Sequence, residues 1–125
     1  MEKSIRRLPD GELTVMQAVW ACATPATRGE IQQQIPADHT MALTTLLTLL
    51  TRLAEKGFLA VEKVGRGNSY TRLITREEYL SAQSRRFVDL LCGGSVSVLA
   101  SALCRSGLSK EELSQLRQLL EEGDL

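Results

Sequence analysis

The chain has 125 residues, 43% of them hydrophobic, and its 15 Lys and Arg residues are balanced by 15 Asp and Glu residues. This length suits one compact domain or two small ones, and the balanced charge by itself indicates neither a polyanionic partner nor a membrane surface. The three cysteines, Cys22, Cys92 and Cys104, are odd in number and widely spaced, which argues against a disulfide framework and a CxxC metal site. We expect reduced thiols in the core.

The sequence contains no apolar stretch of the roughly 20 residues that a membrane-spanning helix needs, and its first residues lack the pattern of a secretory signal. We therefore expect a cytoplasmic protein with no membrane insertion. Charge is distributed unevenly, since residues 1–74 hold nine basic against seven acidic side chains and residues 75–125 hold six against eight. This asymmetry is too small to indicate a partner.

Two helices are predicted in the first part of the chain. The first lies between Pro9 and Pro25, where apolar side chains recur at helical spacing: Leu13, Met16, Val19 and Trp20. Thr27 and Glu30 have the spacing of a capping box, which starts a short second helix that Pro36 ends. A turn-like linker follows at residues 37–40.

A third helix is predicted from Met41 to Lys56, with Gly57 at its C-terminal end. Its helical spacing gives an apolar face: Ala42, Leu46, Leu49, Leu50 and Leu53. The opposite face carries polar side chains, most of them threonine: Thr44, Thr48, Thr51, Arg52 and Glu55.

Threonine is a mediocre helix former, costing a few tenths of a kcal/mol per residue, so a threonine-rich face calls for a compensating role. Its short side chain can lie deep in the DNA major groove and contact phosphates, base edges and thymine methyls. We predict a recognition helix at residues 42–56, with these candidate contacts: Thr44, Thr45, Thr48, Thr51 and Arg52. The alternative is a merely tolerated solvent-exposed face. Arg52 is placed to reach a phosphate or to pair with Glu55, and the two contacts are not exclusive.

After Gly57 the pattern changes to the alternation typical of strands. Two such runs flank a turn at residues 65–68, which predicts a β-hairpin over residues 58–74. Lys63, Arg66 and Arg72 lie on or beside it, and Arg66 at the tip is the most favourably placed to contact DNA. Three helices followed by a hairpin is the order of a winged helix-turn-helix.

The rest of the sequence is helical in pattern. Capping boxes at Thr75 and Ser109 and a cap at Ser95 predict three short helices. Because so small a unit buries too little apolar surface alone, we expect residues 1–74 to form a DNA-binding domain and residues 75–125 a dimerisation domain. The predicted dimer-interface residues are apolar: Tyr79, Phe87, Leu90, Leu91, Leu99, Leu103, Leu113, Leu116, Leu119 and Leu120.

Nothing in the sequence indicates catalysis. His39 is the only histidine, it has no ligand cluster at metal-binding spacing, and no phosphate-binding glycine loop or paired-carboxylate motif is present. We expect no enzymatic activity, no cofactor and no metal. The aromatic residues are too scattered to form a base-stacking platform and are expected in the core: Trp20, Phe58, Tyr70, Tyr79 and Phe87.

Four segments in this order and spacing resemble the BlaI/MecI/CopY family of penicillinase- and copper-responsive transcriptional repressors: GELTVMQAVW, TTLLTLLTRLAEKGFL, GRGNSYTRLITREEYL and LSKEELSQLRQLLEE. The resemblance implies a mainly α fold with a small β-hairpin wing, in which an N-terminal winged helix-turn-helix precedes a C-terminal three-helix dimerisation domain. It also implies a homodimer that represses transcription at a palindromic, double-stranded DNA operator.

Carried over by position, the resemblance implies DNA contacts at family threonines, a family arginine and the wing: Thr45, Thr48, Arg52, Lys63 and Arg66. Two positions depart from the family pattern, because Thr44 and Leu47 stand where the penicillinase repressors usually have a basic residue and an arginine. The operator sequence therefore need not be theirs, and Leu47 could instead meet a thymine methyl.

The family's penicillinase repressors are inactivated by proteolysis at an Asn-Phe bond, and the aligned pair in this chain is Ser101-Ala102. The residues of this chain therefore do not imply cleavage by a membrane sensor protease. A gene for such a protease beside the gene for this chain would again favour regulated cleavage. The cysteine pairs of the copper-responsive members have no counterpart in the final LLEEGDL. Two alternatives stay open: a winged-helix protein-interaction module, and a small-ligand-gated regulator.

Overall fold

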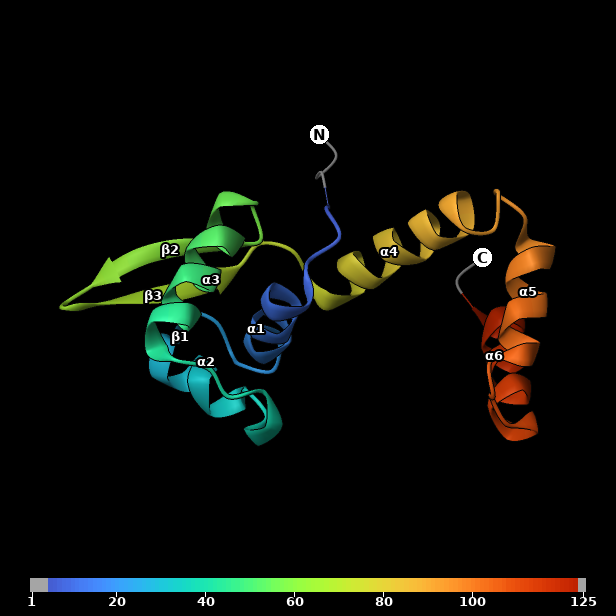
Figure 1. The fold of residues 1–125 in the computed structure, drawn as a ribbon, viewed down its shortest axis with the longest axis horizontal. Helices are drawn as coiled ribbons and strands as arrows, with labels where there is room; N and C mark the ends of the chain where they lie inside the picture. Colours follow the sequence, from blue (N-terminus) through green and yellow to red (C-terminus); the bar gives the residue numbers. More distant parts are fainter. Residues whose placement is uncertain (1–4, 124–125) are drawn as a thin grey trace. The chain divides into compact units, whose positions relative to one another are not determined.

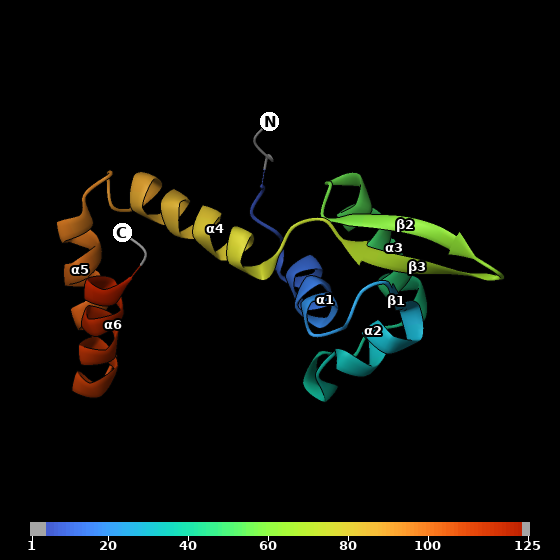
Figure 2. The ribbon, with the colours of Figure 1, turned by 180° about the vertical axis from the view of Figure 1, so that it is seen from behind.

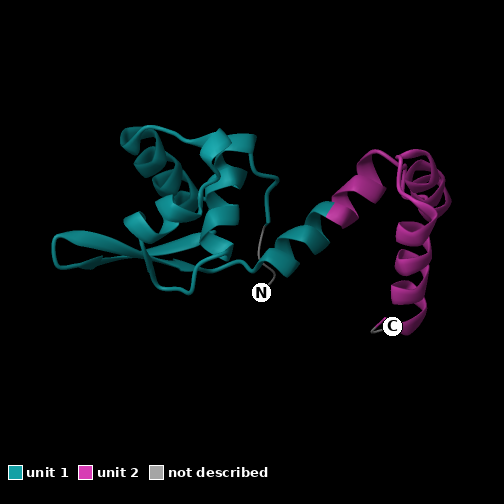
Figure 3. Cartoon of the chain, turned by 90° about the horizontal axis from the view of Figure 1, so that it is seen from below, with its two compact units in different colours: residues 1–83 teal, residues 84–125 magenta. Residues whose placement is uncertain are grey.

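The computed structural model describes residues 5–123, and the chain divides into two compact units, residues 1–83 and 84–125 (Figure 3). The division falls inside helix α4 (Arg76–Leu90). One helix therefore contributes residues to both units. The assignment of residues 1–74 and 75–125 to two functional domains stays a prediction.

The first unit follows the predicted order of three helices and a hairpin (Figures 1 and 2). Its elements are α1 (Asp10–Trp20), β1 (Ala26–Thr27), α2 (Arg28–Gln34), a 3-10 turn at Ala37–His39, α3 (Leu43–Glu55), β2 (Leu59–Val64) and β3 (Gly67–Arg72). The predicted fold class, mainly α with a small hairpin wing, is confirmed. The sequence did not indicate β1, whose two residues are too short for any alternation to show.

The three strands form an antiparallel sheet in the order β1-β3-β2. In the hairpin, Leu59 lies opposite Arg72 and Val64 opposite Gly67, so the register runs without interruption to the turn. Tyr70 of β3 pairs with Ala26 of β1 on its other side. The short strand β1 therefore ties the segment between α1 and α2 to the middle of β3.

Local signals set the helix ends as the sequence predicts. Thr27 Oγ1 accepts a hydrogen bond from the backbone N–H of Glu30 at 3.1 Å, and Glu30 Oε1 accepts one from the Thr27 N–H at 2.9 Å. Gly57 has a φ of 84°, a left-handed conformation that glycine adopts without strain. The Phe58 N–H then donates to the Leu53 carbonyl at 2.9 Å, closing the end of α3.

The core of the first unit forms where the apolar faces of α1 and α3 meet the sheet. Its fully buried side chains include Val15, Met16, Val19, Leu46, Leu50, Leu53 and Phe58. Burying each such side chain contributes about 1.5–3 kcal/mol. Ala42, predicted on the apolar face of the third helix, is instead exposed, because it is the N-cap of α3 and its backbone is extended.

Tyr79 belongs to this core, which corrects its assignment to a dimer interface. Its ring lies 5.5 Å from that of Trp20 and 5.8 Å from that of Phe58, and its hydroxyl accepts a hydrogen bond from the Leu8 N–H at 2.9 Å. With 5% of its surface exposed, it offers nothing to a second chain. Phe87, predicted as a core aromatic, is 43% exposed.

The second unit contains the end of α4, α5 (Val96–Arg105) and α6 (Lys110–Glu122). Ser95 caps α5, and Ser109 forms a capping box with Glu112, as predicted. No side chain of α5 or of the described residues of α6 is buried. These two helices therefore do not complete a core by themselves.

The three cysteines are free, but they are not all core thiols. Cys92 is buried and Cys22 half-buried, whereas Cys104 on α5 is exposed. The prediction of three core thiols is thus wrong for Cys104. Its apolar neighbours on α5 line a groove that is open in the single chain, so Cys104 stays exposed.

Within residues 5–123 no helix combines the length and the apolar character required to cross a bilayer.

Candidate nucleic-acid interface

The outward face of α3 carries every residue predicted for the recognition helix. All are exposed: Thr44, Thr45, Leu47, Thr48, Thr51 and Arg52. The opposite face is anchored by Leu46, Leu50 and Leu53, so the helix cannot rotate without exposing core leucines. This anchoring presents the threonine face at the surface of the first unit.

Two of these threonines bond to their own helix. Thr48 Oγ1 donates to the Thr44 carbonyl at 2.9 Å, and Thr51 Oγ1 donates to the Leu47 carbonyl at 3.0 Å. A hydroxyl bonded in this way has used its single proton and keeps its oxygen lone pairs and its methyl for other contacts. Thr48 and Thr51 therefore present acceptors and methyl groups.

Arg52 brings a positive charge to the same face, one turn beyond Thr48. Its side chain and those of three threonines surround a shallow hollow of about 270 Å³, lined by Thr44, Thr45, Thr48, Leu49 and Arg52. The start of α3 also lacks a neutralising group, since Ala42 makes no side-chain cap and the first turn has no acidic residue. This face therefore suits an anionic, groove-shaped surface such as duplex DNA.

The hairpin projects beyond the helices of the first unit (Figures 1 and 2). Lys63 on β2 and Arg66 in the turn are both exposed, and Gly65 adopts a φ of 60° that places Arg66 at the tip. Arg72 differs, because its Nη1 donates to the Cys22 carbonyl at 3.0 Å. The structure thus separates two exposed wing cations from a third that fastens the hairpin base to the loop after α1.

A partly buried ion pair links α3 to α1, and sequence reasoning missed it. Lys56 Nζ lies 2.6 Å from Glu12 Oε1, and the two side chains are 22% and 5% exposed. Glu12 could have been found, because it stands three and four residues before Val15 and Met16 and therefore on the buried face of α1. A charged residue at such a position needs a partner.

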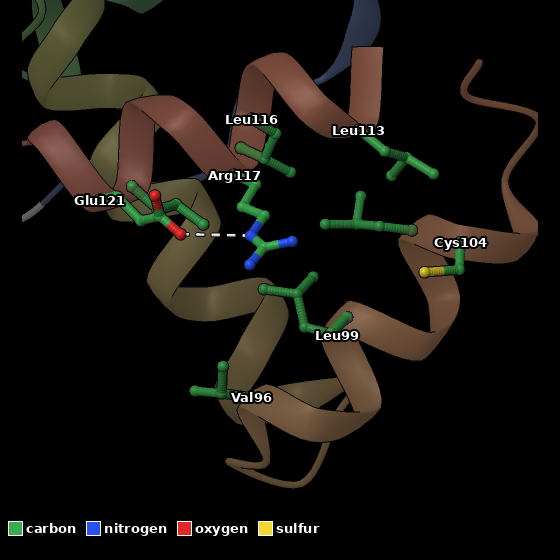
Figure 4. Close-up of a pocket in the computed structure, with 10 residues that line it drawn as sticks. Val96, Leu99, Cys104, Leu113, Leu116, Arg117 and Glu121 are labelled. Atoms are coloured by element: carbon green, nitrogen blue, oxygen red, sulfur yellow. Dashed lines mark hydrogen bonds and ion pairs between the residues drawn. The ribbon is translucent and has the colours of Figure 1, made fainter. Parts of the chain in front are cut away.

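In the second unit, α5 and α6 enclose an open apolar groove of about 520 Å³. Figure 4 shows leucines from both helices turned toward it, with Arg117 and Glu121 on α6 joined by an ion pair of 3.2 Å. Four predicted interface leucines line it half-buried: Leu99, Leu103, Leu113 and Leu116. Five other residues predicted for the dimer interface are exposed: Phe87, Leu90, Leu91, Leu119 and Leu120. Of these five, only Leu120 also lines the groove.

Ser101 and Ala102 are exposed near the middle of α5. Proteases cleave preferentially at exposed loops, and both residues are held in a helix.

His39 is exposed in the 3-10 turn, 3.8 Å from Asp38, and residues 5–123 contain no group of three or more His, Cys, Asp or Glu side chains placed to hold a metal.

Comparison with known proteins gives one consistent result. The family described as Penicillinase repressor matches residues 8–122. The chain is similar to the penicillinase repressor of Bacillus licheniformis, with 33% identity over 96% of this chain and 94% of that protein. It is also similar to the methicillin resistance regulatory protein MecI of Staphylococcus aureus, with 26% identity over 96% and 98% of the two chains.

Among solved structures, the chain is similar to the monomeric form of Bacillus licheniformis BlaI in complex with the blaP half-operator. The TM-score is 0.50 and the sequence identity 32%, and the match covers 62% of this chain and 94% of that one.

Proposed function

The chain belongs to the penicillinase repressor family, and from this premise we propose that it is a dimeric, cytoplasmic repressor that binds a palindromic DNA operator. Family membership confirms the resemblance found in the four sequence segments. The family is one of transcriptional repressors, so this chain is a regulator and not an enzyme.

The exposed threonine face of α3 is the observation that carries the DNA-binding part of the proposal. A helix anchored by its leucines and presenting short hydroxyl side chains and an arginine fits the major groove. Lys63 and Arg66 on the projecting hairpin would contact the sugar-phosphate backbone nearby. The similar BlaI chain, solved with its half-operator, supports this use of the unit.

The apolar groove between α5 and α6 supports the dimer. Leu119 and Leu120 are 61% and 60% exposed in the single chain. A second copy of the chain would remove these leucines from water by burying the same face of both chains. Two DNA-binding units related by two-fold symmetry would then read two half-sites of a palindrome in successive major grooves. Tyr79 is not part of this proposed interface.

Induction in this proposal does not depend on cutting the bond between Ser101 and Ala102. The pair lacks the Asn-Phe sequence that the family resemblance associates with cleavage, and it lies within α5. A membrane sensor protease is therefore not required as a partner.

A salt titration with the purified full-length protein tests the proposal. Because the chain has no net charge, its affinity for random duplex DNA is expected to be modest at low salt and to fall steeply as salt is added. A duplex enriched from a randomised library should bind at least about 10³-fold more tightly than random duplex. Negligible binding to either DNA at low salt would contradict the proposal and favour a protein-interaction module.

A further inference from the structure

An apolar pair lies beside the threonines on the outer face of α3. Leu43 and Leu47, one helical turn apart, are 45% and 40% exposed. The core does not need them, because Leu46, Leu50 and Leu53 already cover the inner face of this helix. Two large aliphatic side chains thus stand on the surface that would enter the DNA groove.

The same face lacks the side chains that usually read bases by paired hydrogen bonds. Between Leu43 and Thr51, α3 contains no Arg, Lys, Asn or Gln. Thr48 and Thr51 have already spent their hydroxyl protons on the Thr44 and Leu47 carbonyls, so their methyl groups and lone pairs remain. Along Leu43, Leu47 and Thr51 the face of α3 therefore offers methyl groups and no side-chain donor, while Thr44 and Thr45 beside them keep their hydroxyl groups.

Aliphatic side chains can distinguish one feature of the major groove, the C5-methyl group of thymine. We propose that Leu43 and Leu47, supported by the methyl group of Thr51, read thymine methyls in each operator half-site, and that this apolar contact is the main source of sequence preference in α3. This inference rests on the proposed DNA-binding function and specifies the chemistry that the site recognises.

The test begins with a duplex selected by the full-length protein from a randomised library. Each thymine of one half-site is then replaced in turn by deoxyuridine, which removes the methyl and keeps every hydrogen-bonding group. At one or two positions the dissociation constant is expected to rise about fourfold per methyl removed.

Variants assign the effect to the two leucines. Leu43→Gln and Leu47→Gln should each abolish the preference for thymine over deoxyuridine at one position, while Leu47→Met, still apolar, should retain it. Leu80→Gln is the matched control, because Leu80 is 47% exposed on α4 and should leave the preference unchanged. Glutamine, methionine and leucine have similar helix propensities, so the substitutions should leave α3 intact.

The outcomes separate this inference from the proposed function. If a duplex is selected but deoxyuridine binds as well as thymine at every position, the protein binds DNA and the methyl readout is wrong. A preference for thymine that survives both glutamine substitutions would also overturn the role of the leucines. Failure to select any duplex would overturn the proposed function and this inference together.

Discussion

Lys56 Nζ and Glu12 Oε1 lie 2.6 Å apart, and this bond joins the end of α3 to the first turn of α1. Lys56 is the C-cap of α3, and Glu12 stands near the N-terminus of α1. Each charge therefore also interacts favourably with the dipole of its own helix, because its sign is opposite to the partial charge at that helix end. Glu12 is buried, with 4% of the residue exposed. The pair therefore ties the C-terminal end of α3 to α1.

Removing the lysine should leave a carboxylate buried without its partner. Lys56→Met is expected to lower the free energy of unfolding by about 3 kcal/mol, and Glu12→Gln by less, because it leaves no buried negative charge. Urea unfolding followed by the fluorescence of Trp20, which lies in the same unit, measures both. The control Lys63→Met, at an exposed position, should change stability by no more than about 0.5 kcal/mol. Equal stability of Lys56→Met and the unsubstituted protein would show that the pair contributes nothing.

Arg52→Ala should weaken binding to all duplexes by a similar factor, because a phosphate contact does not depend on base sequence. The slope of log affinity against log salt should decrease in magnitude by about 1 for each chain substituted. Gel-shift titrations at several salt concentrations give both quantities, with Arg105→Ala on α5 as the control. Operator binding by Arg52→Ala that matches the unsubstituted protein would rule out the contact.

Thr48→Ala should instead change the order of affinities for different operator sequences.

Leu120→Gln should dissociate the proposed dimer without unfolding the chain. Leu120 is 60% exposed in the single chain, so little monomer stability depends on it, while symmetry places the change twice in the interface. If both copies lose a buried leucine, at about 1.5–3 kcal/mol each, the dimer dissociation constant rises at least about 100-fold. Sedimentation equilibrium measures this. Leu47→Gln, the same substitution in the first unit, should remain dimeric, and an unaffected dimer in Leu120→Gln would place the interface elsewhere.

Cysteine alkylation should report the same interface. Cys104 lines the α5–α6 groove and is exposed in the single chain, so iodoacetamide should modify it faster in Leu120→Gln than in the dimer. Cys22 should react slowly in both, because burial, aided by the Glu30 carboxylate, raises the pKa of its thiol above 9.0 and little thiolate forms at pH 8. Mass spectrometry of timed samples gives the rates. Equal rates for Cys104 in the two proteins would argue that the groove is open in solution.

The raised pKa of Cys22 also sets a direction for stability. The folded state favours the protonated thiol, so this contribution is fully present below pH 9.0 and is lost as the pH rises through the folded-state pKa. The difference in unfolding free energy between the unsubstituted protein and Cys22→Ala should therefore decrease as the pH rises above 9.0.

The amino-acid sequence by itself determined the elements and the exposed face of α3. Capping boxes at Thr27, Thr75 and Ser109 and the left-handed Gly57 act within a few residues, so local chemistry suffices to place helix ends. The helical spacing of the leucines and threonines likewise decides which side of α3 is buried. The ranges of the helices and hairpin followed from these signals to within a few residues.

Only the tertiary structure decided which side chains meet across long stretches of chain. It placed Tyr79 beside Trp20 and under the Leu8 amide, paired Glu12 with Lys56, and turned Arg72 toward the Cys22 carbonyl. It also left Cys104 and Phe87 exposed. Periodicity reports that a residue is apolar and which way it faces along its own helix, whereas burial depends on whether another element covers that face, and this is settled only when distant segments pack.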